Sequence, residues 1–524
     1  MDIELQKSLA DSLRWRCKNS ADDIAIKFLD REQTYSEFDT NSNLVSQGLL
    51  NFGIKKDSRV AYLAKNSDYF FEIFYGALKS SSVVVGVNWR LAADEVAYVL
   101  EDSKSEVLFV GPEFFEIIEK IKDRLPFLKH IISIDKDHSD WLSYKSWRNN
   151  QENKDPLSIS EENDDVIQLY TSGTTGNPKG VQLTNRNFSS ATESTIELIP
   201  FTSGSISMVC MPVYHIAGTN WGIWGLLQGC KNIIIPEVDP GLILDLVEQE
   251  EVELVLWVPA VILFLLQHPN ASKTNFSSLK MVMYGASPMP EPVIVKAMEM
   301  LPNCTFYHAY GQTECAPLLT CSGPEAHVFE GPLAYKFKSC GRAVAGVELK
   351  IADDHGNEVP RGEVGEIYAR GPNIMLGYWR QKELTDKAIE NGWMKTGDGA
   401  KMDDDGYVFI VDRVKDMIIS GGENIYSTEV ENAIYQIKEV LECAVIGIPD
   451  PKWGEVVHAV IRVKDNKKIE EKTIIDHCHK NIAGFKCPKS VSFRNEPMPV
   501  SGAGKILKTE LRKPFWKDSD KQVN

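Results

Sequence analysis

The chain has 524 residues, 43% of them hydrophobic and 25% charged, so it can bury a large core and is expected to form two or more domains. Its formal net charge of −17 argues against a general nucleic-acid-binding role, because neutralising phosphates requires clustered Lys and Arg. The ten cysteines form no CxxC pair, which predicts free thiols in a reducing compartment.

The N-terminal segment has no apolar stretch of the kind that secretory signals carry. The longest apolar run, residues 254–266, is shorter than the roughly 20 residues of a membrane-spanning helix and contains Pro259. It predicts a buried strand followed by a helix. We therefore expect a cytoplasmic protein without a transmembrane segment, either a monomer or a homodimer.

Short β-rich runs alternate with helical patterns in the first part of the chain. Strands are predicted at residues 59–63, 82–86, 106–110 and 166–170. Between the second and third, Ala92, Val96, Val99 and Leu100 have helical spacing. This alternation predicts an α/β fold with layered sheets.

Residues 170–180 (YTSGTTGNPKG) follow the predicted strand at 166–170. Hydroxyl side chains there alternate with glycines, which let backbone N–H groups turn toward an anion. The segment suits a polyphosphate, although it is not a Walker A loop, because Gly180 stands where a Ser or Thr would hold Mg²⁺. A flexible turn is the alternative interpretation.

The later part of the chain contains four more segments with chemical potential: 307–314 (YHAYGQTE), 393–398 (WMKTGD) with 412–416 (DRVKD), 420–425 (SGGENI) and 499–508 (PVSGAGKILK). Taken alone, each has an ordinary interpretation, such as a hairpin turn or a solvated side chain. Strands are predicted at 362–370 and 406–411.

A small α+β unit is predicted after Arg413. Thr428 and Glu431 have the spacing of a capping box. The helix that follows would bury Val430, Ala433, Ile434 and Ile437, and strands are predicted at 444–448 and 456–463. We expect an N-terminal domain at residues 1–412, a hinge at 413–416 and a C-terminal domain at 417–524.

These five segments, in this order, resemble the signatures of the adenylate-forming (ANL) superfamily, which includes acyl-CoA synthetases, peptide-synthetase adenylation domains and firefly-type luciferases. The resemblance covers roughly residues 23–511. It implies a large N-terminal α/β domain with layered sheets and a β-rich subdomain, plus a small mobile α+β C-terminal domain. It also implies an acid–thiol ligase that uses ATP, Mg²⁺ and coenzyme A.

The resemblance carries roles onto residues of the N-terminal domain. The phosphate loop corresponds to Thr171, Ser172, Gly173, Thr174, Thr175 and Lys179. The wall beside the adenine and acyl sites corresponds to Gly285, Ala286 and Ser287. Tyr310 would stack on adenine beside Gly311, Thr313 would contact phosphate, and Glu314 with Thr171 would hold Mg²⁺.

Other roles fall near the proposed hinge and beyond it. Asp398 would accept the ribose hydroxyls, Arg413 would make a second ribose or phosphate contact, and Lys415 matches the hinge position. Gly421 and Gly422 would border the coenzyme A channel after the small domain rotates. Lys505 matches the catalytic lysine, although Ala503 stands where relatives have Thr or Ser.

The acid is only partly specified. Residues 211–215 (MPVYH) resemble the segment that gates the acyl pocket, and amino-acid-activating relatives place Asp at the position of His215. A histidine cannot offset a substrate ammonium, so amino acids are disfavoured. Residues 216–224 are mostly apolar, which favours a medium- or long-chain fatty acid, while short-chain, thio-substituted and aryl acids stay open.

Alternatives to an acyl-CoA ligase also stay open. An enzyme that loads a carrier protein, or stops at acyl-AMP, would share every ATP-binding residue. A non-catalytic nucleotide sensor is disfavoured by the presence of Glu314, Asp398, Arg413 and Lys505. An oxygenating luciferase is the remote fourth possibility.

Overall fold

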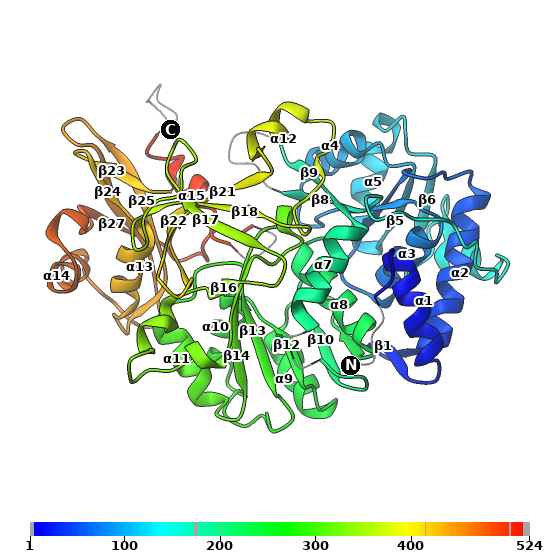
Figure 1. The fold of residues 1–524 in the computed structure, drawn as a ribbon, viewed down its shortest axis with the longest axis horizontal. Coiled ribbons are helices and arrows are strands. Elements are labelled where there is room, and N and C mark those ends of the chain that lie inside the picture. Colours follow the sequence, from blue (N-terminus) through cyan, green and yellow to red (C-terminus); the bar gives the residue numbers. More distant parts are fainter. Residues whose placement is uncertain are drawn as a thin grey trace.

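The computed structural model describes residues 5–171, 177–196, 198–199, 201–413, 416–501 and 505–516. Within them the chain forms four sheets covered by helices, with a large N-terminal part and a smaller C-terminal part. Figure 1 shows the first 150 residues (blue and cyan) at one end of the long axis and the C-terminal elements (orange and red) at the other. The predicted α/β fold class is confirmed.

The N-terminal sheet has eight strands in the order β19-β9-β8-β4-β3-β5-β6-β7. Their bounds are β3 Arg59–Leu63, β4 Val83–Gly86, β5 Val107–Val110, β6 His130–Ser133, β7 Leu142–Ser143, β8 Asp165–Thr171, β9 Lys179–Thr184 and β19 Gly377–Tyr378. The associated helices are α2 Tyr35–Asn51, α3 Asp68–Lys79, α4 Ala93–Ser103, α5 Phe115–Ile121 and α6 Tyr144–Asn149. The four strands predicted between residues 59 and 170, and the helix after residue 92, are confirmed within two residues, because each is a continuous or amphipathic apolar run.

The central sheet has nine strands in the order β16-β15-β14-β13-β12-β10-β11-β1-β2. Their bounds are β1 Ile24–Phe28, β2 Arg31–Thr34, β10 Ile206–Val209, β11 Lys231–Ile234, β12 Leu254–Leu256, β13 Met281–Gly285, β14 Thr305–Tyr310, β15 Thr320–Ser322 and β16 Arg342–Ala343. The neighbouring helices are α1 Leu9–Asn19, α7 Asn185–Ile196, α8 Ile216–Gln228, α9 Pro240–Gln249, α10 Pro259–Gln267 and α11 Glu291–Met300. Strand β12 followed by α10 confirms the prediction for residues 254–266.

Six neighbouring strands of the central sheet, from β1 to β14, are parallel. Parallel strands point their carboxyl ends to one edge of a sheet, and ligands of α/β proteins bind at such edges. Gly285 ends β13 and Tyr310 ends β14, so two of the predicted site segments begin at the same edge.

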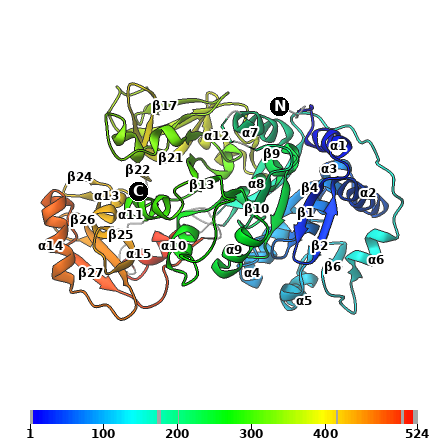
Figure 2. The ribbon, with the colours of Figure 1, turned by 90° about the horizontal axis from the view of Figure 1, so that it is seen from below.

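A five-stranded β-rich subdomain follows, and Figure 2 shows it on one side of the central sheet. Its strands are β17 Glu348–Ala352, β18 Gly365–Arg370, β20 Ile389–Glu390, β21 Trp393–Met402 and β22 Val408–Arg413, with α12 Lys382–Ala388 beside them. The KTGD segment lies inside β21 and does not form a hairpin turn. The pairing of β21 with β18 is irregular between Lys395 and Gly399, and Gly397 in this stretch has a φ of 74°.

The C-terminal sheet consists of β23 Ile418–Ser420, β24 Glu423–Ile425, β25 Val440–Asp450, β26 Gly454–Val463 and β27 Ser490–Phe493. Its helices are α13 Ser427–Tyr435, α14 Glu471–Asn481 and α15 Lys508–Arg512. The sheet has a hydrophobic core of its own, which includes Ile418, Val430, Ile434, Val445 and Ile461.

The predicted capping box at Thr428 and Glu431 is wrong. Helix α13 begins at Ser427, and its N-cap residue Tyr426 makes no side-chain capping bond. The Thr428 hydroxyl instead donates to the Val411 carbonyl, and Glu431 accepts from the Val445 N–H at 2.8 Å. Hydrogen bonds to residues distant in the sequence have replaced the local bonds of a capping box.

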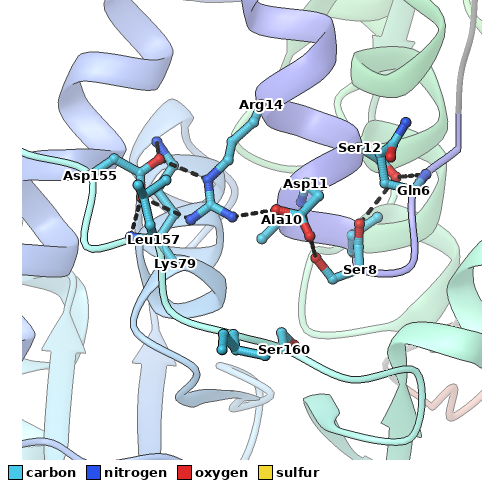
Figure 3. Close-up of polar contacts among 12 residues, drawn as sticks. Gln6, Ser8, Ala10, Asp11, Ser12, Arg14, Lys79, Asp155, Leu157 and Ser160 are labelled. Carbon is cyan, nitrogen blue, oxygen red and sulfur yellow. Dashed lines mark hydrogen bonds and ion pairs between the residues drawn. The ribbon is translucent and has the colours of Figure 1, made fainter.

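Polar contacts attach the first helix to the N-terminal part (Figure 3). Ser8 caps α1 by accepting from the Asp11 N–H at 3.1 Å. The Arg14 guanidinium forms two bonds to Asp155, of 2.7 and 2.8 Å, and a third to Asp11 at 2.7 Å. Paired bonds of this kind fix orientation, so α1 is held against the segment that leads to β8.

Two further sequence predictions concern the cysteines and the membrane. All ten cysteines are free thiols, and nine of them are buried. Among the described helices, none combines the length and apolar character required to cross a membrane.

Candidate active site

Close backbone approach shapes the edge where β13 and β14 end. A Cβ on Gly285 would lie 2.0 Å from the Ala309 carbonyl oxygen, and one on Gly311 would lie 1.8 Å from that of Pro317. Ala286 has a φ of 65°, a conformation that non-glycine residues rarely adopt and that costs about 1 kcal/mol or more. Glycine at 285 therefore lets the end of β13 approach β14 closely, and glycine at 311 lets the segment after β14 approach Pro317.

Asp398 lies next to this edge and is 8% exposed. Its Oδ2 accepts from the Tyr310 hydroxyl and from the Gln312 side-chain amide, both at 2.8 Å. Burial, and next the Asp398 charge, raise the pKa of Tyr310 well above its usual value, so the phenol stays protonated and donates. The predicted ribose and adenine residues are thus in direct contact.

Gln312 is a residue that the sequence interpretation missed. Its amide nitrogen also donates to the Thr396 carbonyl at 2.7 Å, so it ties the end of β14 to β21. Its place between Gly311 and Thr313, inside a segment already singled out, is the signal that could have found it.

Arg413 lies opposite Asp398, because the two residues are paired in the β21–β22 register. The Arg413 Nε is 3.6 Å from Asp398 Oδ1. Asp398 therefore has one oxygen bound by neutral donors and the other facing a cation. That arrangement holds the carboxylate in one orientation.

Glu314 lies in the short 3-10 turn Thr313–Cys315. Its Oε1 accepts from the Tyr378 hydroxyl at 3.0 Å, while Oε2 has no protein partner in the part of the chain that the structure describes. The Lys179 ammonium lies 4.8 Å from the centre of the Tyr378 ring. Tyr378 was not predicted from the sequence, because it reaches Glu314 across 64 residues through the pairing of β19 with β9.

Thr171 ends β8 and is paired with Lys179 of β9. The other predicted phosphate-loop residues, Ser172, Gly173, Thr174 and Thr175, lie outside the described residues, as does Lys415. Carboxylate and hydroxyl oxygens are hard ligands of the kind that Mg²⁺ prefers. Glu314 and Thr171 therefore fit the predicted metal.

Lys505 comes from the C-terminal part of the chain, three residues before α15. Its N–H donates to Ser501 Oγ at 3.2 Å, and its carbonyl accepts from the Ser501 N–H at 2.7 Å. Burial, with the charge of Arg413, lowers the pKa of its ammonium to about 8, against the opposing effect of Asp398 and Glu314. The ammonium thus lies within the electrostatic reach of three residues of the N-terminal part.

His215 also lies within the electrostatic reach of this ammonium. It is the N-cap residue of α8, and its Nδ1 accepts from the Ala217 N–H at 3.2 Å, which leaves the proton on Nε2. Burial, and then the Lys505 charge, lower its pKa to about 4. The imidazole is therefore neutral at pH 7.

Every residue of α8 is buried, including Trp221 and Trp224. Trp221 packs 5.0 Å from the ring of Phe201 and 6.4 Å from that of Trp224. Both indoles therefore pack against side chains of the protein core.

Gly421 and Gly422 are not part of this cluster. They are exposed at the turn between β23 and β24, with φ values of 62° and 88°. The Trp453 indole lies against one side of Gly421, and a Cβ added there would lie 2.6 Å from the ring. Figure 1 shows this hairpin at the outer end of the C-terminal sheet.

A family model described as AMP-binding enzyme matches residues 13–379, and a second, described as AMP-binding enzyme C-terminal domain, matches residues 429–505. The chain belongs to the AMP-binding enzyme family. It is accordingly an ATP-dependent, AMP-forming acid–thiol ligase of the adenylate-forming superfamily.

Known members resemble this AMP-binding enzyme along nearly its whole length. It is 34% identical to a fatty acid–[acyl-carrier-protein] ligase, ScoC, of Streptomyces coeruleorubidus, with 94% of each chain covered. It is 35% identical to a feruloyl-CoA synthase of Amycolatopsis sp, with 95% of this chain and 97% of that one covered. The crystal structure of the anthranilate CoA ligase AuaEII with anthranoyl-AMP superimposes with a TM-score of 0.90, at 27% identity and 98% coverage of both chains.

Proposed function

We propose that this AMP-binding enzyme activates a carboxylic acid with ATP and transfers the acyl group to the thiol of coenzyme A. One observation carries the proposal. The Lys505 ammonium lies within electrostatic reach of four predicted site residues at once: Glu314, Asp398, Arg413 and His215. A cation brought from the C-terminal part to a carboxylate-lined nucleotide site suits charge stabilisation during phosphoryl-group chemistry.

In the first step a carboxylate oxygen of the acid attacks the α-phosphorus of ATP, and the bond to pyrophosphate breaks. Asp398 would accept the ribose hydroxyls, which fixes the nucleotide relative to the acid. Lys505 would offset negative charge on the phosphoryl oxygens, with Thr171 and the phosphate loop supplying further donors. Mg²⁺ bound at Glu314 and Thr171 would neutralise phosphate charge when present.

In the second step the thiol sulfur attacks the acyl carbonyl carbon, the thiol proton is lost, and the bond to AMP breaks. No protein nucleophile takes part. His215, neutral with its Nε2 proton available, would border the acyl carboxylate without placing a charge beside it.

The two steps would alternate by rotation of residues 417–524 about a hinge at 413–416. The separate core of the C-terminal sheet supports a unit that moves as one body. The exposed position of Gly421 and Gly422, in the arrangement where Lys505 faces Glu314, supports a second arrangement in which they replace it.

A medium- or long-chain fatty acid is our preferred substrate, because helix α8, which begins directly after His215, is mostly apolar. The fatty-acid-activating relative supports this choice. An aryl acid is the second candidate, since the feruloyl-CoA synthase and the anthranilate CoA ligase act on aromatic acids. A carrier-protein thiol is the alternative acceptor, favoured by the ScoC relative. The ten free thiols fit a cytoplasmic setting.

The test is release of pyrophosphate and AMP over a panel of acids, from acetate through palmitate to benzoates and ferulate, with and without coenzyme A. We expect AMP release that requires coenzyme A and is fastest with a fatty acid. Pyrophosphate release that ignores coenzyme A, with acyl-AMP accumulating, would assign a different acceptor. Omission of Mg²⁺ with EDTA present should abolish the first step.

A further inference from the structure

Helix α13 begins without a cap from its own chain neighbourhood. The first N–H groups of a helix lack partners within the helix and concentrate partial positive charge. The side chain of its N-cap residue Tyr426 makes no capping bond. The N–H of Ser427 donates instead to Asp412 Oδ2 at 2.5 Å, from the end of strand β22.

This cap crosses the proposed hinge. Asp412 is the last residue of the proposed N-terminal domain, and Ser427 belongs to the C-terminal one. A second bond crosses at the same place, since the Thr428 hydroxyl donates to the Val411 carbonyl. Both bonds join the end of β22 to the first turn of α13.

Lys508 extends the contact toward the active site. Its ammonium donates to Ser427 Oγ and pairs with Glu431 at 2.8 Å. Burial raises the pKa of the Asp412 carboxyl, and the nearby Lys508 charge opposes that rise. Lys508 follows Lys505 by three residues, and Figure 2 shows α15 (red) where the C-terminal elements meet the rest of the chain.

Asp412 also adjoins the nucleotide side of the site. Its Oδ1 accepts from the Arg413 N–H at 2.8 Å, and Arg413 is the partner of Asp398. One carboxylate therefore contacts the strand that holds the nucleotide-facing arginine and the helix whose first turn binds Lys508.

We propose that Asp412 is a positioning residue for adenylate formation, which holds Lys505 in the active site by capping α13 across the hinge. The inference rests on the proposed function. It adds that the hydrogen bond between Ser427 and Asp412 must break before the thioester-forming arrangement appears. An electrostatic cap suits this task, because it is strong enough to bias an equilibrium and weak enough to open during turnover.

The test separates the two half-reactions. Adenylate formation is followed as acid-dependent exchange of labelled pyrophosphate into ATP. Thioester formation is followed in a single turnover that starts from supplied acyl-AMP and coenzyme A. For Asp412→Ala we expect adenylate formation to fall about tenfold, with thioester formation equal to or faster than that of the wild type. Asp412→Asn, whose amide oxygen can still accept from Ser427, should recover part of the exchange rate.

The matched control is Asp239→Ala. Asp239 caps α9 by accepting from the Leu242 N–H at 3.0 Å, entirely within the N-terminal part. The Asp239→Ala variant removes an equivalent cap far from the hinge in sequence. It should therefore not change the rate of one half-reaction relative to the other. A second variant, Thr428→Val, removes only the hydroxyl that crosses the hinge and should shift the ratio in the same direction as Asp412→Ala.

Two failures are distinguishable. A wild-type enzyme that neither exchanges pyrophosphate nor consumes acyl-AMP would overturn the proposed function, and the positioning role with it. A wild-type enzyme that performs both steps, with Asp412→Ala slowing both equally or neither, would overturn the positioning role alone. Thermal unfolding of each variant identifies any loss of activity that comes from loss of the fold.

Discussion

Arg413 lies opposite Asp398 on the neighbouring strand, with its Nε 3.6 Å from Asp398 Oδ1, while Asp398 Oδ2 accepts from Tyr310 and Gln312. The carboxylate is thus held from both sides by side chains of the protein itself. Such preorganisation lowers the cost of fixing a ribose, because the acceptor does not have to be ordered on binding.

Replacing Gln312 by Ala should therefore weaken ATP binding. The variant removes two bonds, one to the Asp398 carboxylate and one to the Thr396 carbonyl. Bonds to charged groups are worth about 1.5–3 kcal/mol, so we expect the KM for ATP to rise about tenfold or more, with a smaller change in kcat.

The control for that measurement is Gln47→Ala. It removes a hydrogen bond from a side-chain amide on α2 to the Lys154 carbonyl, outside the candidate active site. It should leave the KM for ATP unchanged. A KM for ATP within about twofold of wild type in Gln312→Ala would mean that Tyr310 and Arg413 suffice to orient Asp398.

The pKa of Lys505 predicts an alkaline limit to adenylate formation. Burial and Arg413 lower this pKa from 10.5 to about 8, so the ammonium loses its charge as the pH rises through that value. The pH profile of kcat/KM for ATP reports groups of the free enzyme. We expect that profile to fall on the alkaline side of about pH 8.

Lys505→Arg tests the assignment, because a guanidinium stays charged throughout this range. The variant should be slower, but its profile should lack the alkaline fall. Lys505→Ala should lose adenylate formation by about a hundredfold or more and keep thioester formation from supplied acyl-AMP. An alkaline fall that persists in Lys505→Arg would assign it to another group.

Local sequence patterns suffice to predict several strands of the N-terminal sheet. The strands near residues 59–63 and 107–110 are continuous apolar runs, and they lie where the periodicity predicts. The segments at 285–287 and 310–314 meet because parallel strands end at one edge, which follows from the α/β topology.

Contacts between distant segments were not predictable in the same way. Gln312 reaches Asp398 across 86 residues, and Tyr378 reaches Glu314 across 64. Thr428 and Glu431 had the spacing of a capping box, yet the first bonds Val411 and the second pairs with Lys508. Register and domain contact decide such partners, and neither is encoded in a short window.

The environment of His308 predicts that the free energy of unfolding falls in acid. Its ring stacks on Tyr284 with centroids 4.7 Å apart, and its Nδ1–H donates to the Ser339 carbonyl at 3.0 Å. Burial lowers its pKa to about 4. Because the unfolded chain binds this proton below about pH 6.5 and the folded one does not, stability falls as the pH drops from about 6.5 to 4.

From pH 7 to pH 5 this histidine alone should lower the free energy of unfolding by about 2 kcal/mol. In His308→Gln the decline between the two pH values, measured by urea denaturation, should be smaller by that amount. His355→Gln, a change at an exposed position, should keep the wild-type decline. Equal declines in wild type and His308→Gln would show that His308 takes up its proton without unfolding.

Lys415→Pro tests the proposed hinge. Proline fixes φ near −65° and removes a backbone donor, so it would restrict rotation about this position. We expect adenylate formation to stay within about threefold of wild type, while thioester formation from supplied acyl-AMP falls by about tenfold or more.

Lys468→Pro, in the exposed loop before α14, is the matched control for a proline in the C-terminal domain. It should not separate the half-reactions. Combining Lys415→Pro with Asp412→Ala adds a sharper test. Where the hinge is already restricted, loss of the cap can no longer release the thioester-forming arrangement, so thioester formation in the double variant should stay as slow as in Lys415→Pro alone. Equal loss of both half-reactions in Lys415→Pro would instead mean that residue 415 supports the fold and that the turning point lies elsewhere.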